Sequence, residues 1–360
     1  MTIEPHVQML LSLLKSALWN TAPDEKLFVH TEETVWKKIM DLSMKQGVKA
    51  IALDGAMKLP KELQPPRNLR LAWAAFVDKV ERNYAYRVSI AKELSELFAK
   101  NGMKMLLFKG LSLSQHYPVP EHREFGDLDI YLFGKHDEGN KLLVENGAKR
   151  ENFNIPKHTV LHYKNVMIEN HIFFLDMADT PKIQVLENKL RKLAVSDENQ
   201  ALLFPKPAFL TLFLMCHAIH HFTYTTHFRS FCDWAVFLNA HQGKLDFSSY
   251  RQDLSEAGFL KVADAFTALT VKYFGLNPEF APPFENNFEL EDEIFINGIF
   301  SMMPVNPAQP FYKKLIFKAY RFKRRLKYYE MLYPGKTYRR IWYAIYYHLR
   351  KPKEILSLKK

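Results

Sequence analysis

The sequence is poor in cysteine and contains no long uncharged apolar run. Its 360 residues include only two cysteines, Cys216 and Cys232, and neither belongs to a C-x-x-C pair, which excludes a disulfide framework and disfavours zinc. No apolar run approaches the length that crosses a bilayer. The N-terminal segment lacks the basic region and small-residue cleavage site of a signal peptide. None of the 13 glycines forms a Walker-A or Rossmann pattern. We therefore expect a cytoplasmic protein.

Positive charge is concentrated at the C-terminus. The formal net charge is +11, whereas residues 311–360 hold 16 Lys and Arg against two acidic residues, so the rest of the chain is slightly acidic. This segment is also rich in aromatic residues. Such a mixture on helices suits an anionic membrane surface. It also suits nucleic acid, which we favour less. The third alternative is a terminal helical hairpin with packed aromatics and solvated charges.

Residues 103–132 are the most informative segment. An apolar run ends in Lys109-Gly110, and a second apolar run carries the sequence G-D-L-D-I, which includes Asp127 and Asp129. Because side chains alternate along a strand, both carboxylates would point to one face. Adjacent carboxylates repel each other unless a cation lies between them, and oxygen ligands suit Mg²⁺ or Mn²⁺ better than zinc. A lone D-x-D is also common on solvated surfaces, so the surrounding motifs decide between a metal site and a surface.

The finer pattern, F-K-G-L-S-L followed by Y-P-x-P-x-x-R-x-x-G-D-L-D-I, resembles the uncharacterised bacterial nucleotidyltransferase-5 family of the polymerase-β-like superfold. The resemblance implies a glycine turn that cradles a triphosphate, with Lys109, Gly110 and Ser112 near the β- and γ-phosphates. It also implies that the two aspartates hold metals that bridge the phosphates and the nucleophile. Core members of the superfold have Gly-Ser or Gly-Gly at the turn, whereas Leu111 follows Gly110 here.

The superfold also requires a third carboxylate on a neighbouring strand. Residues 166–174 are rich in β-branched and aromatic residues and short enough for one strand, with Glu169 and His171 on one face. The resemblance makes Glu169 the third metal ligand or the general base. His171 would hold Glu169 or contact phosphate. Arg123 either binds phosphate and orders the site or pairs with a neighbouring glutamate.

A second group of polar residues occupies residues 217–238. His217, His220 and His221 have the spacing of one helix face, and the family has a similar pattern of histidines followed by Arg and Asp. We expect His217 and His221 to line the nucleotide cleft or pack against the sheet. We expect Arg229 to form a partly buried ion pair with Asp233, although Arg229 could also reach a phosphate.

The pattern of helices and strands predicts an α+β fold, a small mixed β-sheet nucleotidyltransferase core flanked by N-terminal and C-terminal helical regions. Residues 1–101 read as helical, including a long helix from Asn68 to Asn101. Residues 102–180 would form the α/β core, and residues 181–305 a helical domain that closes the cleft, with breaks such as residues 202–205. Residues 306–360 would form the basic aromatic tail, preceded by a linker at 306–310.

The resemblance implies a metal-dependent nucleotidyltransferase that moves an NMP from an NTP, such as ATP, to an unidentified acceptor and releases pyrophosphate. Two Mg²⁺ or Mn²⁺ ions would be held by Asp127, Asp129 and Glu169. A tail that binds lipid would place the protein at the inner membrane surface. The alternative is a non-catalytic nucleotide-binding or scaffold protein whose tail binds membrane or RNA.

Overall fold

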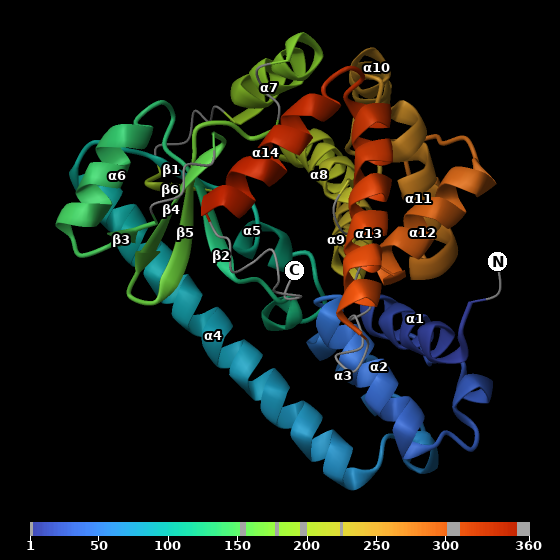
Figure 1. The fold of residues 1–360 in the computed structure, drawn as a ribbon. Helices are drawn as coiled ribbons and strands as arrows, with labels where there is room; N and C mark the ends of the chain where they lie inside the picture. The colour runs from blue at the N-terminus through green and yellow to red at the C-terminus, as the bar shows by residue number, and fades with distance from the viewer. Residues whose placement is uncertain are drawn as a thin grey trace.

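The computed structural model describes residues 3–151, 156–176, 180–194, 200–223, 226–300 and 310–350. A mixed six-stranded sheet lies to one side of a large set of helices (Figure 1). The predicted α+β class is confirmed. No helix in the described ranges is long and apolar enough to cross a membrane.

The sheet has the strand order β3-β4-β5-β2-β1-β6. Strands β2 and β5 run parallel, as do β1 and β6, whereas the other neighbouring pairs are antiparallel. The strands are β1 Met105–Leu107, β2 Asp127–Tyr131, β3 Lys149–Arg150, β4 His158–Tyr163, β5 Val166–His171 and β6 Leu202–Leu203. Strand β6 departs from the prediction, which treated residues 202–205 only as a break. Two residues give too little periodicity to reveal a strand, and the pairing with β1 creates it.

A single long helix connects the N-terminal helices to the sheet (Figure 1). This helix, α4, matches the helix predicted for residues 68–101 to within one residue at each end. Its C-terminal half packs Ile90, Leu94 and Phe98 against Leu128 and Ile168 of the sheet. That contact buries one face of β2 and β5, so the acidic side chains of these strands occupy the opposite face. The helices of this region are α1 Pro5–Trp19, α2 Glu33–Lys45, α3 Lys49–Met57 and α4 Arg67–Lys100.

The N-terminal and C-terminal helices share one continuous apolar core. Leu10 and Leu13 of α1 belong to the same buried cluster as Phe213 of α8 and Phe231 of α9. The remaining helices are α5 Leu111–Ser114, α6 His136–Glu145, α7 Pro181–Ala194, α8 Pro207–Phe222, α9 Phe228–Ala240, α10 Phe247–Ala257, α11 Leu260–Phe274, α12 Phe288–Phe300, α13 Phe311–Leu332 and α14 Thr337–Arg350.

The basic tail is helical and docks on the protein through the end of α13. The ring centroids of Phe222 and Tyr328 lie 4.3 Å apart, and the Tyr333 hydroxyl lies 3.1 Å from Nδ1 of His220. Helix α14 then turns back toward the sheet (Figure 1). Most of the predicted linker, residues 306–309, and the last ten residues of the tail lie outside the described residues.

Candidate active site

The register between β2 and β5 brings the three predicted carboxylates together. Asp129 lies directly opposite Glu169, and Asp127 is two residues earlier on the same face of β2. The carboxylate oxygens of Asp127, Asp129 and Glu169 all lie within 4.8 Å of one another. Asp129 is buried, while Asp127 and Glu169 are partly exposed. The group is therefore open to solvent on one side and could hold a metal ion.

Asp129 is the electrostatic centre of this group. Its Oδ1 atom lies 3.1 Å from Nζ of Lys109 and 2.9 Å from Nε2 of His171. Burial favours the protonated acid, but the ammonium and imidazole outweigh it and hold the pKa of Asp129 well below its usual range. Burial and the charge of Asp129 instead raise the pKa of Asp127. Asp129 therefore keeps its negative charge more readily than Asp127 does.

The other oxygen of Asp129 fits a cation. Oδ2 is buried and accepts no hydrogen bond from any described residue. A buried carboxylate oxygen without a partner is costly, and an oxygen-rich group open to solvent suits Mg²⁺ or Mn²⁺. The residues present therefore fit a divalent ion.

The turn at Gly110 requires glycine. Its φ is 52° and its ψ is −99°, a backbone conformation that residues other than glycine rarely adopt. A Cβ at this position would also lie 3.0 Å from Cδ2 of Phe125. The amide of Ser112 donates to the carbonyl of Lys109 at 3.0 Å, which closes the turn. Ser112 is fully buried on α5, so its predicted phosphate contact stays a prediction.

Arg123 forms a buried ion pair with Asp233. Its Nε donates to Oδ1 of Asp233 at 2.9 Å, its Nη2 donates to Oδ2 at 2.8 Å, and Tyr117 also donates to Oδ1. The expected pair between Arg229 and Asp233 is therefore wrong. Helical spacing made that pair plausible, but the loop before β2 places the guanidinium of Arg123 against Asp233, and Arg229 donates to a backbone carbonyl instead.

Arg229 and Arg87 both lie near Asp127 of the acidic group. Arg229 donates through Nη1 to the carbonyl of Glu124 at 2.9 Å, and Arg87 of α4 packs its guanidinium 5.5 Å from the ring centre of Phe125. Burial lowers the pKa of both guanidinium groups, and the negative charge of Asp127 counteracts this shift in each. Sequence reasoning missed Arg87 because nothing distinguishes it from the other charged residues of a 34-residue helix.

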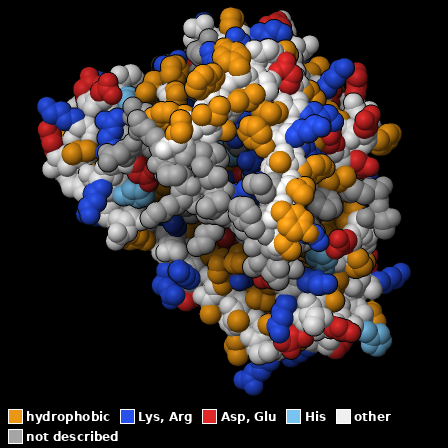
Figure 2. Space-filling view, in the orientation of Figure 1, with side chains coloured by type: hydrophobic (Ala, Val, Ile, Leu, Met, Phe, Trp, Pro, Cys, Tyr) orange, Lys and Arg blue, Asp and Glu red, His pale blue; other side chains and the backbone are white. Residues whose placement is uncertain are grey.

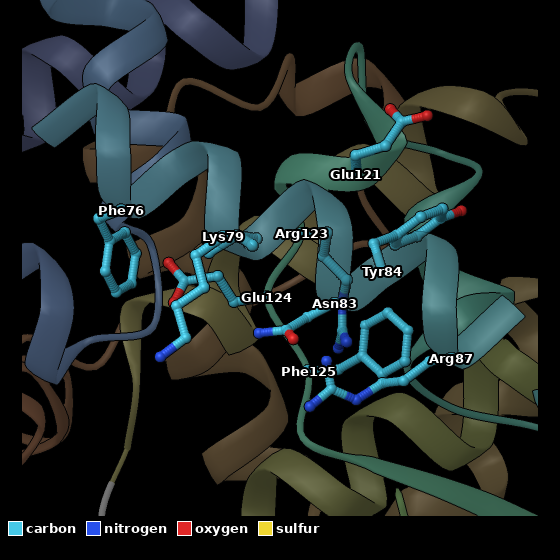
Figure 3. A pocket seen from close by; sticks show the side chains of 10 residues that line it. Phe76, Lys79, Asn83, Tyr84, Arg87, Glu121, Arg123, Glu124 and Phe125 are labelled. Carbon is cyan, nitrogen blue, oxygen red and sulfur yellow. The ribbon is translucent and has the colours of Figure 1, made fainter.

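A cavity of about 210 Å³ opens beside Arg87 (Figure 3). Side chains from α4 and from the loop before β2 form its walls, and they include basic, aromatic and acidic residues: Lys79, Tyr84, Arg87, Glu121, Arg123, Glu124 and Phe125. Figure 3 shows the ring of Phe125 close to the guanidinium of Arg87, and the Tyr84 ring packs edge-on against Phe125 with the ring centroids 5.9 Å apart. The guanidinium of Arg87 beside an aromatic ring suits an anionic ligand that also carries a planar ring.

His217 and His221 of α8 lie near Lys109. His217 stacks on Phe213, and the ring centroids of His217 and His221 lie 4.3 Å apart. Burial lowers the pKa of both histidines well below the ordinary value, and the ammonium of Lys109 lowers both further. The structure thus brings His217 and His221 to the Lys109 side of the carboxylates.

His158 is a residue of this face that sequence reasoning missed. Its Nδ1 lies 3.6 Å from Oε2 of Glu169. The available sequence signal was Asn165, a residue type that tolerates the left-handed conformation of tight turns. In the structure Lys164 and Asn165 both have positive φ and form the turn between β4 and β5. This hairpin pairs Tyr163 with Val166 and therefore His158 with His171.

His122 anchors the loop that leads to the site. Its ring nitrogens lie 2.7 Å from Oδ2 of Asp54 and 2.9 Å from Oε1 of Glu81. Burial lowers the pKa of His122, but the hydrogen bonds to both carboxylates outweigh burial and raise it to about 8. The loop is therefore tied to α3 and α4 by a charged histidine at neutral pH.

One comparison with known proteins identifies a family. Residues 32–275 match the sequence profile of a family described as uncharacterised nucleotidyltransferases. No curated protein and no solved structure matches the chain.

Proposed function

We propose, from the premise that the chain belongs to this uncharacterised nucleotidyltransferase family, that it transfers an NMP from an NTP to an acceptor and uses divalent metal ions to do so. The observation that carries the proposal is the group of Asp127, Asp129 and Glu169 beside the Lys109-Gly110 turn. Clustered carboxylates with an orphan buried oxygen have no evident structural purpose, since their mutual repulsion destabilises the fold.

The proposed reaction forms one bond and breaks another. An acceptor oxygen forms a bond to the α-phosphorus, and the bond from that phosphorus to the bridging oxygen breaks. Pyrophosphate leaves with the electron pair, and the acceptor proton passes to a carboxylate, for which Glu169 is our candidate. When bound at Asp127, Asp129 and Glu169, Mg²⁺ or Mn²⁺ would supply neutralisation of phosphoryl charge.

The cationic side chains have a proposed role in holding the triphosphate. Lys109, Arg87 and Arg229 lie within electrostatic reach of the acidic group, so an NTP bound there would meet positive charge on several sides. Arg123 is our candidate for ordering the phosphate-binding loop through Asp233. The core of residues 102–180 and the helical domain of residues 181–305 would enclose the nucleotide, with His217 and His221 on the wall of the cleft.

A ligand-induced shift in melting temperature tests binding of the NTP. We expect a non-hydrolysable ATP analogue with Mn²⁺ or Mg²⁺ to stabilise the wild-type protein, by about 2.7 kcal/mol at a ligand concentration of 100 times Kd. Asp127→Asn should abolish the shift. Asp137→Asn is the matched control, because Asp137 is 95% exposed on α6 and is not one of the three clustered carboxylates. An undiminished shift in Asp127→Asn would rule out the proposed site.

The charge of Arg87 gives a second test of the same proposal. Arg87→Gln removes a guanidinium at the cavity, and the loss of one charge-assisted contact should raise the Kd for the NTP analogue about tenfold. Arg82→Gln is the control on the same helix, because Arg82 is 68% exposed and pairs with Asp78. Equal affinities of the two variants would remove Arg87 from the site.

A scaffold that binds nucleotide without transfer is the competing function. It is favoured by one observation, the departure of the turn from Gly-Ser or Gly-Gly to Gly110-Leu111. Such a protein would retain the metal-dependent shift in melting temperature and yet transfer no labelled nucleotide to any acceptor.

A further inference from the structure

Two histidines share the sheet face that carries the acidic group. The register of the β4–β5 hairpin places His158 opposite His171, and their ring centroids lie 4.8 Å apart. With Glu169 they form a second set whose ligand atoms all lie within 4.8 Å of one another. Glu169 also belongs to the three-carboxylate group, so the two sets adjoin.

The orientation of His171 is typical of a metal ligand. Its Nδ1 lies 3.1 Å from the carbonyl of Phe173, which can only accept, so Nδ1 carries a proton and donates it. Its Nε2 lies 2.9 Å from Oδ1 of Asp129, to which it donates a hydrogen bond when protonated, and 3.6 Å from Oε2 of Glu169. A metal ion would bind Nε2 in place of that proton. In metal sites, a backbone carbonyl commonly fixes one ring nitrogen of a histidine and thereby aims the other at the ion.

His158 has buried ring nitrogens that need a partner. Its side chain is 10% exposed, and neither nitrogen makes a hydrogen bond to any described residue. The 3.6 Å separation from Glu169 is too long for a hydrogen bond. A buried polar group without a partner costs about 1–3 kcal/mol, so the position calls for an explanation. An ion between His158 and Glu169 supplies one.

We propose that His158, Glu169 and His171 bind a divalent transition-metal ion next to the ion held by Asp127 and Asp129. The inference rests on the proposed function in one respect, that Glu169 serves both ions. Imidazole nitrogen suits first-row transition metals, whereas Mg²⁺ strongly prefers oxygen. This set therefore selects Mn²⁺ over Mg²⁺, while the all-oxygen set accepts either.

Pulsed electron paramagnetic resonance of bound Mn²⁺ tests the assignment without any assay of turnover. Electron spin-echo envelope modulation of the full chain with Mn²⁺ should contain ¹⁴N coupling from coordinated imidazole. When histidine is labelled with ¹⁵N, the ¹⁴N modulation should be replaced by ¹⁵N modulation. This change would identify histidine as the ligand in the wild-type protein, without any substitution. A 100-fold excess of Mg²⁺ should leave the nitrogen-coupled Mn²⁺ in place.

A pair of matched variants on one strand completes the test. His158→Gln should reduce the nitrogen coupling by about half, since one of two imidazole ligands is lost. His162→Gln should leave it unchanged, because His162 is 43% exposed on β4 and pairs with Glu151. Bound Mn²⁺ without nitrogen coupling would overturn the histidine site and leave the proposed function standing. No bound Mn²⁺ at all would overturn both.

An independent observation concerns the tail. Helix α14 presents a stripe of exposed apolar and aromatic side chains at helical spacing, with exposures from 39% to 76%: Tyr338, Ile341, Trp342, Ile345 and Leu349. Tyr312, Ile316 and Tyr320 continue a similar exposed stripe along α13. Figure 2 shows hydrophobic side chains, with Lys and Arg among them, on the face where α13 and α14 lie in Figure 1. A monomeric soluble protein rarely exposes so continuous a patch.

We propose that this face of α13 and α14 binds an anionic bilayer surface. Residues 311–360 carry a net charge of +14, which complements acidic lipid headgroups. Tryptophan and tyrosine partition to headgroup depth, and an amphipathic helix lies in the plane of the interface.

Flotation with vesicles tests this docking surface. The full chain should bind vesicles of phosphatidylcholine with 30% phosphatidylglycerol and not vesicles of phosphatidylcholine alone, and binding should weaken as salt rises. Trp342→Glu should reduce binding at least tenfold. Leu71→Glu should not, because Leu71 is 61% exposed on α4 outside the patch. Equal binding by Trp342→Glu would overturn the proposal, as would binding of an RNA oligomer without binding of vesicles.

Discussion

The buried pair of Arg123 and Asp233 predicts a large loss of stability when one partner is removed. Both side chains are at least 90% buried, and the two hydrogen bonds of 2.8 and 2.9 Å are parallel. In Arg123→Met, the carboxylate of Asp233 stays buried with Tyr117 as its remaining donor. Removal of one partner of such a pair costs about 3–5 kcal/mol, and the remaining Tyr117 bond places the expected loss near 3 kcal/mol.

Urea denaturation followed by tryptophan fluorescence measures this loss. The double variant Arg123→Met/Asp233→Leu should recover most of the free energy of unfolding, because no charge is then left without a partner. Arg82→Met, which breaks an exposed i, i+4 pair with Asp78, should change it by less than about 0.5 kcal/mol. A loss below about 1 kcal/mol in Arg123→Met would refute the reasoning that this pair organises the loop.

Two further predictions concern the same loop. The pKa of His122 in the folded protein is about 8, above the ordinary 6.5. Its contribution to the free energy of unfolding is therefore fully present below pH 6.5 and is lost as the pH rises through 8. His122→Gln should therefore lower the free energy of unfolding by about 1–2 kcal/mol at pH 6 and leave it unchanged at pH 9; a loss that does not depend on pH would contradict the charge assignment. Gly110→Ala should lower it by about 1–3 kcal/mol through backbone strain and contact with Phe125, whereas Gly126→Ala, which meets no atom within 4 Å, should be neutral in the same denaturation experiment.

Local pattern predicted much of the fold and part of the arrangement at the site. The helical spacing after Pro66 revealed α4 to within a residue, because a long amphipathic stretch carries many independent signals. The alternation in residues 127–131 put Asp127 and Asp129 on one face. The family resemblance supplied Glu169, and the parallel register between β2 and β5 places it opposite Asp129.

The features that sequence reasoning missed depend on tertiary pairing. Strand β6 is two residues long and exists only because β1 lies beside it. Asp233 has a plausible partner four residues away on its own helix, and only the folded loop reveals that Arg123 takes that place. His158 required the hairpin register, which the Lys164-Asn165 turn determines. Arg87 has no local signal, since its position follows from the angle at which α4 crosses the sheet.

Nucleotide transfer itself decides whether Asp127, Asp129 and Glu169 form an active site. The full chain is incubated with α-³²P-labelled NTPs, Mn²⁺ or Mg²⁺ and a total bacterial lysate, beside Asp127→Asn/Asp129→Asn and the control Asp137→Asn. We expect label on a protein, RNA or small molecule with the wild type and the control, and none with the double variant. Label that persists in the double variant, or no label from a wild type that binds NTP and metal, would contradict this expectation.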